Sequence, residues 1–268
     1  MNVREIVDIV LALNGGKRME KTCDQLIEGD WEYPVAGVAT TFMATVDVIR
    51  RTIAMGANLI ITHEPTYFTH LDQTDWIIAD PVYQKKKALI DGNRMSVWRY
   101  HDHMHLGTAD LIYAGLLTDL GWTGYLDASL PSPHCYSIPS TSVAALVGFF
   151  KETLDMKIIR VVGEPEMRCT RVGVLVGGGS LGLGDDKMPA RLMHEQQLDV
   201  MVCGEIYEWT LTAYVRDAAA LGLNKAMIIV GHERSEEPGM KALATRLKPL
   251  LGGTPVHSVD AGEPFIYL

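Results

Sequence analysis

The sequence predicts an α/β protein built from two α/β halves with largely parallel or mixed sheets. Apolar segments of strand length alternate with segments of helical spacing along the whole chain of 268 residues. Turn-forming residues cluster once near the middle of the chain, over 129–133. We therefore expect a first α/β half over residues 1–130 and a second over residues 131–268.

The first half is expected to open with a helix and then alternate. Arg4, Glu5 and Asp8 lie among spaced apolar residues, which is typical of an amphipathic helix and not of a signal peptide. The elements expected next are a helix over 46–56, a strand over 58–62, a helix over 85–91, a strand over 95–100 and a helix over 109–120. Gly92 and Gly121 mark the ends of two of these helices.

In the second half, strands are predicted over 171–176, 199–202 and 226–230, with a helix over 211–221 between the last two. The glycines of 177–182 favour a tight turn over a nucleotide loop, because the segment lacks the lysine of a phosphate-binding loop. Ser235 is expected to cap the last helix, with Glu236 and Pro238 in its first turn.

Charge and composition exclude several classes of partner. The chain has 24 basic against 33 acidic residues, a net charge of −9, which argues against nucleic-acid binding through a basic surface. The run Lys85–Lys87 is expected on the solvated face of a helix. No apolar stretch approaches the roughly 20 residues that cross a bilayer, so no membrane partner is expected. Four scattered cysteines indicate buried thiols and a cytoplasmic location.

Three polar clusters each follow a predicted strand. They are His63-Glu64, the run His101-Asp102-His103-Met104-His105, and His232 with Glu236. Ligands gather outside the carboxyl ends of strands in open α/β sheets, so the three segments are expected to meet at one site. Imidazole and carboxylate without thiolate suit zinc, iron, manganese, cobalt or nickel.

The spacing within two clusters is informative. Pro65 favours an extended Glu64, so His63 and Glu64 point to opposite sides and suit two neighbouring ions. His101, His103 and His105 share a face if the strand continues, whereas only His101 and His105 share one if a helix begins.

At these residues the sequence resembles the Nif-three-like family, whose members are often labelled "GTP cyclohydrolase I type 2". The resemblance rests on Thr62-His63-Glu64-Pro65, on the histidine run over 101–105, on Gly177–Gly179, on Gly204-Glu205, and on Gly231-His232 through Glu236. It covers nearly the whole chain and matches the short form without an inserted middle domain.

The resemblance implies two metal ions in the cleft between the halves, to which the C-terminal strand, loop and helix return. The implied ligands are His63, Glu64, His101, His105, His232 and Glu236. Glu64 stands where the family has a second histidine, and His105 stands where it has aspartate. These exchanges are reciprocal, so the ligand charge is conserved. His103 replaces an asparagine and is a ligand or a supporting group.

The leading hypothesis is a dinuclear metal-dependent hydrolase with Glu205 and Glu208 as candidates for proton transfer or for orienting ligand histidines. The alternative for these two glutamates is that they are solvent-exposed residues at the start of a helix, with no role in the site. The family label suggests a small anionic substrate of the nucleotide or pterin type. The resemblance also implies a homo-oligomer, as a hexameric ring.

Two other hypotheses stay open. One is a non-enzymatic metal-binding adaptor or metallochaperone, because four imidazoles bind metals without any dedicated acid or base. The other is a one-metal enzyme that uses His101, His103 and His105.

Overall fold

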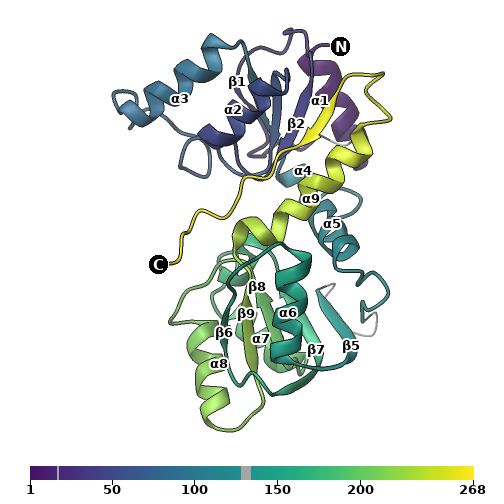
Figure 1. Cartoon of the computed structure of the whole chain (residues 1–268), viewed down its shortest axis with the longest axis vertical. Coiled ribbons are helices and arrows are strands. Elements are labelled where there is room, and N and C mark those ends of the chain that lie inside the picture. Colours follow the sequence, from purple (N-terminus) through teal and green to yellow (C-terminus); the bar gives the residue numbers. More distant parts are fainter. Residues whose placement is uncertain (17, 128–133) are drawn as a thin grey trace. The chain divides into compact units, whose positions relative to one another are not determined.

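The computed structural model describes residues 1–16, 18–127 and 134–268 (Figure 1). The chain forms two compact units, each with its own sheet. The first comprises Met1–Gly115 and Glu237–Gly262, and the second comprises Leu116–Glu236 and Glu263–Leu268. The expected break over 129–133 lies outside the described residues. The mixed α/β class predicted from the sequence is confirmed.

The first unit contains a five-stranded sheet of order β1-β4-β3-β2-β10. Its strands are β1 (Leu26–Glu28), β2 (Val38–Thr41), β3 (Leu59–Thr62), β4 (Ser96–Arg99) and β10 (Val256–Ser258). The four strands β10, β2, β3 and β4 run parallel, and β1 pairs with β4 in the antiparallel sense. The carboxyl ends of β3 and β4 therefore lie at one edge, where His63 and His101 follow them.

The helices that begin in the first unit are α1 (Val3–Ala12), α2 (Val46–Ala54), α3 (Pro81–Gly92), α4 (Asp102–His105) and α5 (Leu111–Asp119). A capping box starts α1, since the Asn2 side chain accepts from the Glu5 N–H while the Glu5 carboxylate accepts from the Asn2 N–H. Apolar residues of α2 and α3 cover one face of the sheet, including Val48, Ile49 and Ile90. This burial makes the unit's core.

The second unit contains a sheet of order β5-β7-β8-β9-β6. Its strands are β5 (Cys135–Ser142), β6 (Arg160–Val162), β7 (Arg168–Leu175), β8 (Val200–Cys203) and β9 (Ala226–Ile229). The central strands β7, β8 and β9 are parallel, and the edge strands β5 and β6 are antiparallel to their neighbours. Strands β8 and β9 are buried along their whole length and β7 is buried over residues 172–175, which explains their continuous apolar runs.

The remaining elements are α6 (Val143–Thr153), the 3₁₀ turn η1 (Gly177–Leu181), α7 (Met188–Glu195), α8 (Leu211–Ala220) and α9 (His232–Leu247). Residues of α7 and α8, among them Met193 and Val215, pack on one face of the second sheet. The tight turn expected in the glycine-rich segment is η1. No helix among the described residues has the length and apolar character needed to cross a membrane.

Two local expectations are wrong. The last helix begins at His232 and not after Ser235, so Pro238 lies inside α9. The Ser235 hydroxyl is used elsewhere: it donates to the His232 carbonyl and accepts from the Gly177 N–H, at 2.7 and 2.9 Å. Lys86 is also not solvated, because it is only 4% exposed and its Nζ donates to the Thr66 carbonyl at 2.6 Å.

Other expectations are confirmed. All four cysteines are free and buried. The strands expected over 58–62, 95–100, 171–176, 199–202 and 226–230 are β3, β4, β7, β8 and β9. Their bounds shift by one to three residues, as is usual where strand ends meet loops.

Candidate metal centre

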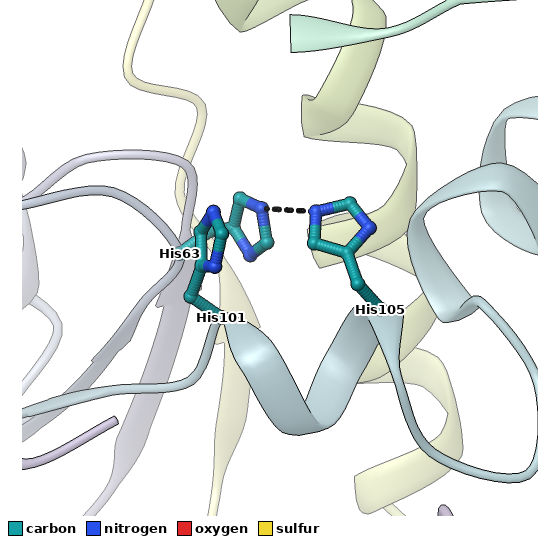
Figure 2. Close-up of side chains that lie close together, drawn as sticks. All are labelled: His63, His101 and His105. Carbon is teal, nitrogen blue, oxygen red and sulfur yellow. Dashed lines mark hydrogen bonds between the residues drawn. The ribbon is translucent and has the colours of Figure 1, made fainter. Parts of the chain in front are cut away.

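Three imidazole rings of the first unit converge on one point (Figure 2). His63 follows β3, while His101 precedes α4 and His105 ends it. The ring of His63 stacks on that of His101, with centroids 4.5 Å apart, and the Nε2 atoms of His63 and His105 are 3.2 Å apart. Two imidazoles on one tetrahedral ion, each at about 2.0–2.1 Å, place their nitrogens roughly 3.3 Å apart. The observed spacing fits two ligands of a single ion.

Each of these rings points its other nitrogen, Nδ1, at an oxygen atom. The acceptors are the Tyr100 carbonyl for His63 at 3.1 Å, the Asp102 carboxylate for His101 at 3.0 Å and the Asp110 carboxylate for His105 at 2.9 Å. Because an oxygen acceptor requires a proton on Nδ1, the neutral form of each ring keeps its lone pair on Nε2. Histidines that bind metal ions in proteins are held in the same way, with the other ring nitrogen donating to a carboxylate or a backbone carbonyl.

The Nε2 atoms of His63 and His105 face each other. In the neutral tautomers of His63 and His105 set by their Nδ1 bonds, two lone pairs face each other at 3.2 Å. Such an arrangement is repulsive unless a proton or a cation lies between the two nitrogens. The donor chemistry of this cluster therefore fits a bound cation.

The protonation of the cluster is uneven. Burial, and then the charge of the neighbouring imidazoles, holds the pKa of His63 well below its ordinary value, so this ring is a neutral base. Burial also acts to lower the pKa of His101, but hydrogen bonds to the Cys23 thiol and to the carboxylates of Glu64 and Asp102 raise it to about 11. A cation that binds His101 must displace its proton.

The carboxylate of Glu64 lies beside the ring of His101. Its Oε1 lies 3.4 Å from His101 Nε2, and its Oε2 lies 3.5 Å from Arg99 Nη2. The Arg99 side chain is completely buried, and its Nε donates to the His63 carbonyl at 3.1 Å. Arg99 therefore holds both the backbone of His63 and the carboxylate of Glu64, a role that the sequence did not reveal.

His103 is turned away from the converging rings. Because the segment after His101 is the helix α4, His101 and His105 share a face and His103 does not. The His103 Nδ1 lies 2.7 Å from Asp24 Oδ2, and its Nε2 accepts from the Met19 N–H at 3.0 Å. Both ring nitrogens are thus engaged by protein groups.

Asp24 organises the start of α4 from a distant segment. Its carboxylate accepts the backbone N–H groups of His101, Asp102 and His103 at 2.8, 2.7 and 3.1 Å, besides the His103 ring. Such a carboxylate satisfies the unpaired N–H groups at a helix N-terminus. Nothing in the local sequence around Asp24 signals this role, because its partners lie 77 to 79 residues away.

Cys23 adds a thiol beside the same cluster. Its Sγ donates to Asp102 Oδ1 at 3.4 Å and its backbone N–H donates to Asp102 Oδ2 at 2.9 Å. Ligand atoms of Cys23, His101 and Asp102 all lie within 4.8 Å of one another. The sequence predicted only that this thiol is buried.

The second unit has an imidazole–carboxylate cluster of its own. Because α9 starts at His232, His232 and Glu236 lie one turn apart on one face, with Nε2 and Oε2 3.1 Å apart. Glu205, which follows β8, places its Oε1 3.0 Å from His232 Nδ1. Of the two glutamates considered from the sequence, Glu205 thus contacts a histidine ring, whereas Glu208 lies exposed in a turn.

Gly177 is required where η1 passes this pair. It adopts a φ of +50°, and an added Cβ would lie 1.9 Å from Glu236 Oε1 and 2.7 Å from His232 Nε2. Any side chain here would occupy the position of the carboxylate. The glycine-rich segment thus permits close approach of backbone to the His232–Glu236 pair.

Comparisons with known proteins agree with the fold. The model of the family described as Duf34/NIF3 (NGG1p interacting factor 3) matches residues 1–259. A Clostridium perfringens protein named "GTP cyclohydrolase 1 type 2 homolog" is 22% identical over 255 residues, covering 91% of this chain and 90% of that protein.

Solved structures are similar over the full length. A Bacillus cereus protein related to NIF3 superposes with a TM-score of 0.76 at 16% identity, covering 100% of this chain and 99% of the other. A Staphylococcus aureus protein gives a TM-score of 0.74 at 19% identity with the same coverage. At these identities the likeness establishes the fold.

Proposed function

The chain belongs to the Duf34/NIF3 family, and from that premise we propose that it is a hydrolase that depends on two divalent transition-metal ions. The proposed ligands are His63, Glu64, His101, His105, His232 and Glu236. The observation that supports metal binding, on which the proposal rests, is the pair of facing Nε2 atoms, 3.2 Å apart, on rings whose Nδ1 atoms are committed to oxygen acceptors.

The residues around the proposed ligands supply orientation. Asp102 and Asp110 hold the rings of His101 and His105, and Glu205 holds the ring of His232. A carboxylate that accepts from Nδ1 makes a histidine a stronger ligand through Nε2. His103 acts through Asp24 on the position of α4, and not as a ligand.

The chemistry proposed is hydrolysis. When bound, a pair of divalent ions lowers the pKa of a coordinated water and polarises the attacked group. Glu205 accepts a hydrogen bond from the His232 Nδ1–H and fixes that ring, and the exposed Glu208 is the candidate for exchanging protons with solvent. Two carboxylate ligands leave two divalent ions with net positive charge, which favours an anionic substrate. The name of the Clostridium perfringens relative supports a substrate of the nucleotide or pterin type.

A non-enzymatic metal-binding adaptor or metallochaperone is the competing function. The observation in its favour is that the first unit's imidazoles are fully supported by protein oxygens, an arrangement that binds a cation without any acid or base for catalysis. A homo-oligomeric ring and a cytoplasmic location stay predictions.

Metal analysis tests the proposal. Protein purified without a histidine tag should contain about two transition-metal ions per chain, as two adjacent sites require. His101→Ala and Glu236→Ala should each remove metal, whereas the matched controls His134→Ala and His257→Ala should not. A reproducible content near one ion, unchanged by Glu236→Ala, would overturn the dinuclear arrangement.

Activity distinguishes the enzyme from the adaptor. Phosphoesters, cyclic amidines and nucleotides are to be screened with manganese, zinc or ferrous iron. Turnover that His63→Ala abolishes supports the hydrolase. Turnover that survives this change shows that another site is responsible, and full metal loading with no turnover of any substrate favours the adaptor.

A further inference from the structure

The loop after β8, residues 204–210, exposes two large aromatic side chains. Tyr207 is 44% exposed and Trp209 is 69% exposed. Their rings are stacked, with centroids 5.6 Å apart and an angle of 13° between the ring planes. Stacking of the two rings leaves an outer aromatic face of Trp209 open to solvent. Exposed tryptophan is costly in apolar surface and is frequent where proteins bind partners.

The loop that carries these rings is held at several points. The Glu205 N–H donates to the Gly177 carbonyl at 2.9 Å, and the Ser180 hydroxyl donates to the Glu205 carbonyl. Two hydroxyls, those of Thr210 and Thr212, donate to the Tyr207 carbonyl at 3.3 and 3.0 Å. The stacked pair is therefore built on a loop whose backbone is anchored, which lowers the entropy lost when a ligand binds.

The same loop carries a residue of the proposed hydrolytic machinery. Glu205, whose carboxylate contacts His232 Nδ1, is two residues before Tyr207 and four before Trp209. An extended chain spans at most about 3.3–3.6 Å per residue, so the Cα of Trp209 lies within roughly 14 Å of the Cα of Glu205. A nucleotide-sized molecule can span such a separation.

We propose that Tyr207 and Trp209 form a stacking platform for the planar fused heteroaromatic ring of the substrate. The assignment of this ligand as the substrate rests on the proposed function; the binding of the ring by the platform does not. Flat heteroaromatic rings stack on aromatic side chains without needing specific hydrogen bonds. The polar ligands of the metal cluster attract an anion by charge, whereas the platform would select an anion that carries a planar ring.

Binding to metal-free protein tests the platform separately from the metal chemistry. The probes are guanosine 5′-monophosphate and ribose 5-phosphate, which has the sugar phosphate without the ring. Trp209→Ala should weaken binding of guanosine 5′-monophosphate at least about fivefold, as loss of one stacking contact implies. Trp209→Phe should restore most of the affinity. Trp76→Ala is the matched control, since Trp76 is 61% exposed on the first unit and should be neutral.

Three outcomes would overturn the inference. One is unchanged affinity for guanosine 5′-monophosphate in Trp209→Ala, and another is an equal loss of ribose 5-phosphate binding. The third is a Trp209→Ala protein that changes its oligomeric state by light scattering while keeping the ligand, which would assign the rings to a contact between copies. If the protein as purified contains no transition metal and yet binds the ring through Trp209, the proposed hydrolase is refuted and the platform stands.

Discussion

Replacing Asp24 by Asn should disorganise the histidine cluster without creating a cavity. Asp24 is 2% exposed in its side chain, and its two oxygens accept four hydrogen bonds from N–H groups, two of them at Oδ2 from the backbone and ring of His103. Asn keeps one acceptor oxygen but puts an NH₂ group in place of the other. Two N–H donors then face a donor. The start of α4 loses one or two of the three backbone hydrogen bonds that Asp24 accepts, depending on which oxygen is replaced.

The expected size of this effect follows from the bonds lost. A hydrogen bond to a charged group contributes about 1.5–3 kcal/mol, so losing two costs roughly 3 kcal/mol of unfolding free energy. Because α4 sets the spacing between His101 and His105, metal affinity should fall about 10- to 100-fold, as it does when other groups that orient metal ligands are changed. Urea unfolding of the metal-free protein measures the first quantity, and calorimetric titration with zinc measures the second.

Asp47→Asn is the matched control, because the Asp47 side chain is 72% exposed and pairs with Arg51 across one helical turn. It should change stability by about 0.5 kcal/mol or less. If Asp24→Asn matched this control in both stability and zinc affinity, Asp24 would not organise α4 and the reasoning would be refuted.

Two further predictions concern packing and pH. Gly239→Ala should lower the free energy of unfolding in urea by about 1–3 kcal/mol, because the new Cβ would lie 2.7 Å from the Cα of Ile112. The control Gly148→Ala lies in a helix with open space around it and should be neutral or slightly stabilising. Equal effects of the two changes would contradict the close helix contact at Gly239. Burial lowers the pKa of Lys86 from 10.5 to about 8. Between these two pH values the unfolded chain binds more protons than the folded chain. The free energy of unfolding of the wild type should therefore rise with pH over this range, by about 3 kcal/mol in total. Unfolding of Lys86→Met and of the exposed control Lys85→Met is measured at pH 7.5 and 10. The rise should be present in Lys85→Met and absent in Lys86→Met. If the difference in unfolding free energy between the two variants is the same at both pH values, the prediction is refuted.

The sequence by itself determined the strands and the places where chemistry follows them. Buried parallel strands are continuous apolar runs, so β3, β4, β7, β8 and β9 could be read directly. The carboxyl ends of parallel strands share an edge, which is why His63 and His101 could be expected close together. Both inferences depend only on local composition and on a general rule of sheet topology.

Only the tertiary structure decided how each imidazole is oriented. The direction of His103, the bonds of Asp24 to α4 and the contact of Arg99 with Glu64 all join residues far apart in the chain, or depend on whether a helix or a strand follows His101. The sequence likewise did not reveal where α9 starts. The Ser235 hydroxyl accepts from the Gly177 N–H, 58 residues away, and does not cap a helix. Local propensity carries no record of such partners, because a side chain's hydrogen bonds are chosen by whatever groups the folded chain brings within about 3 Å of it.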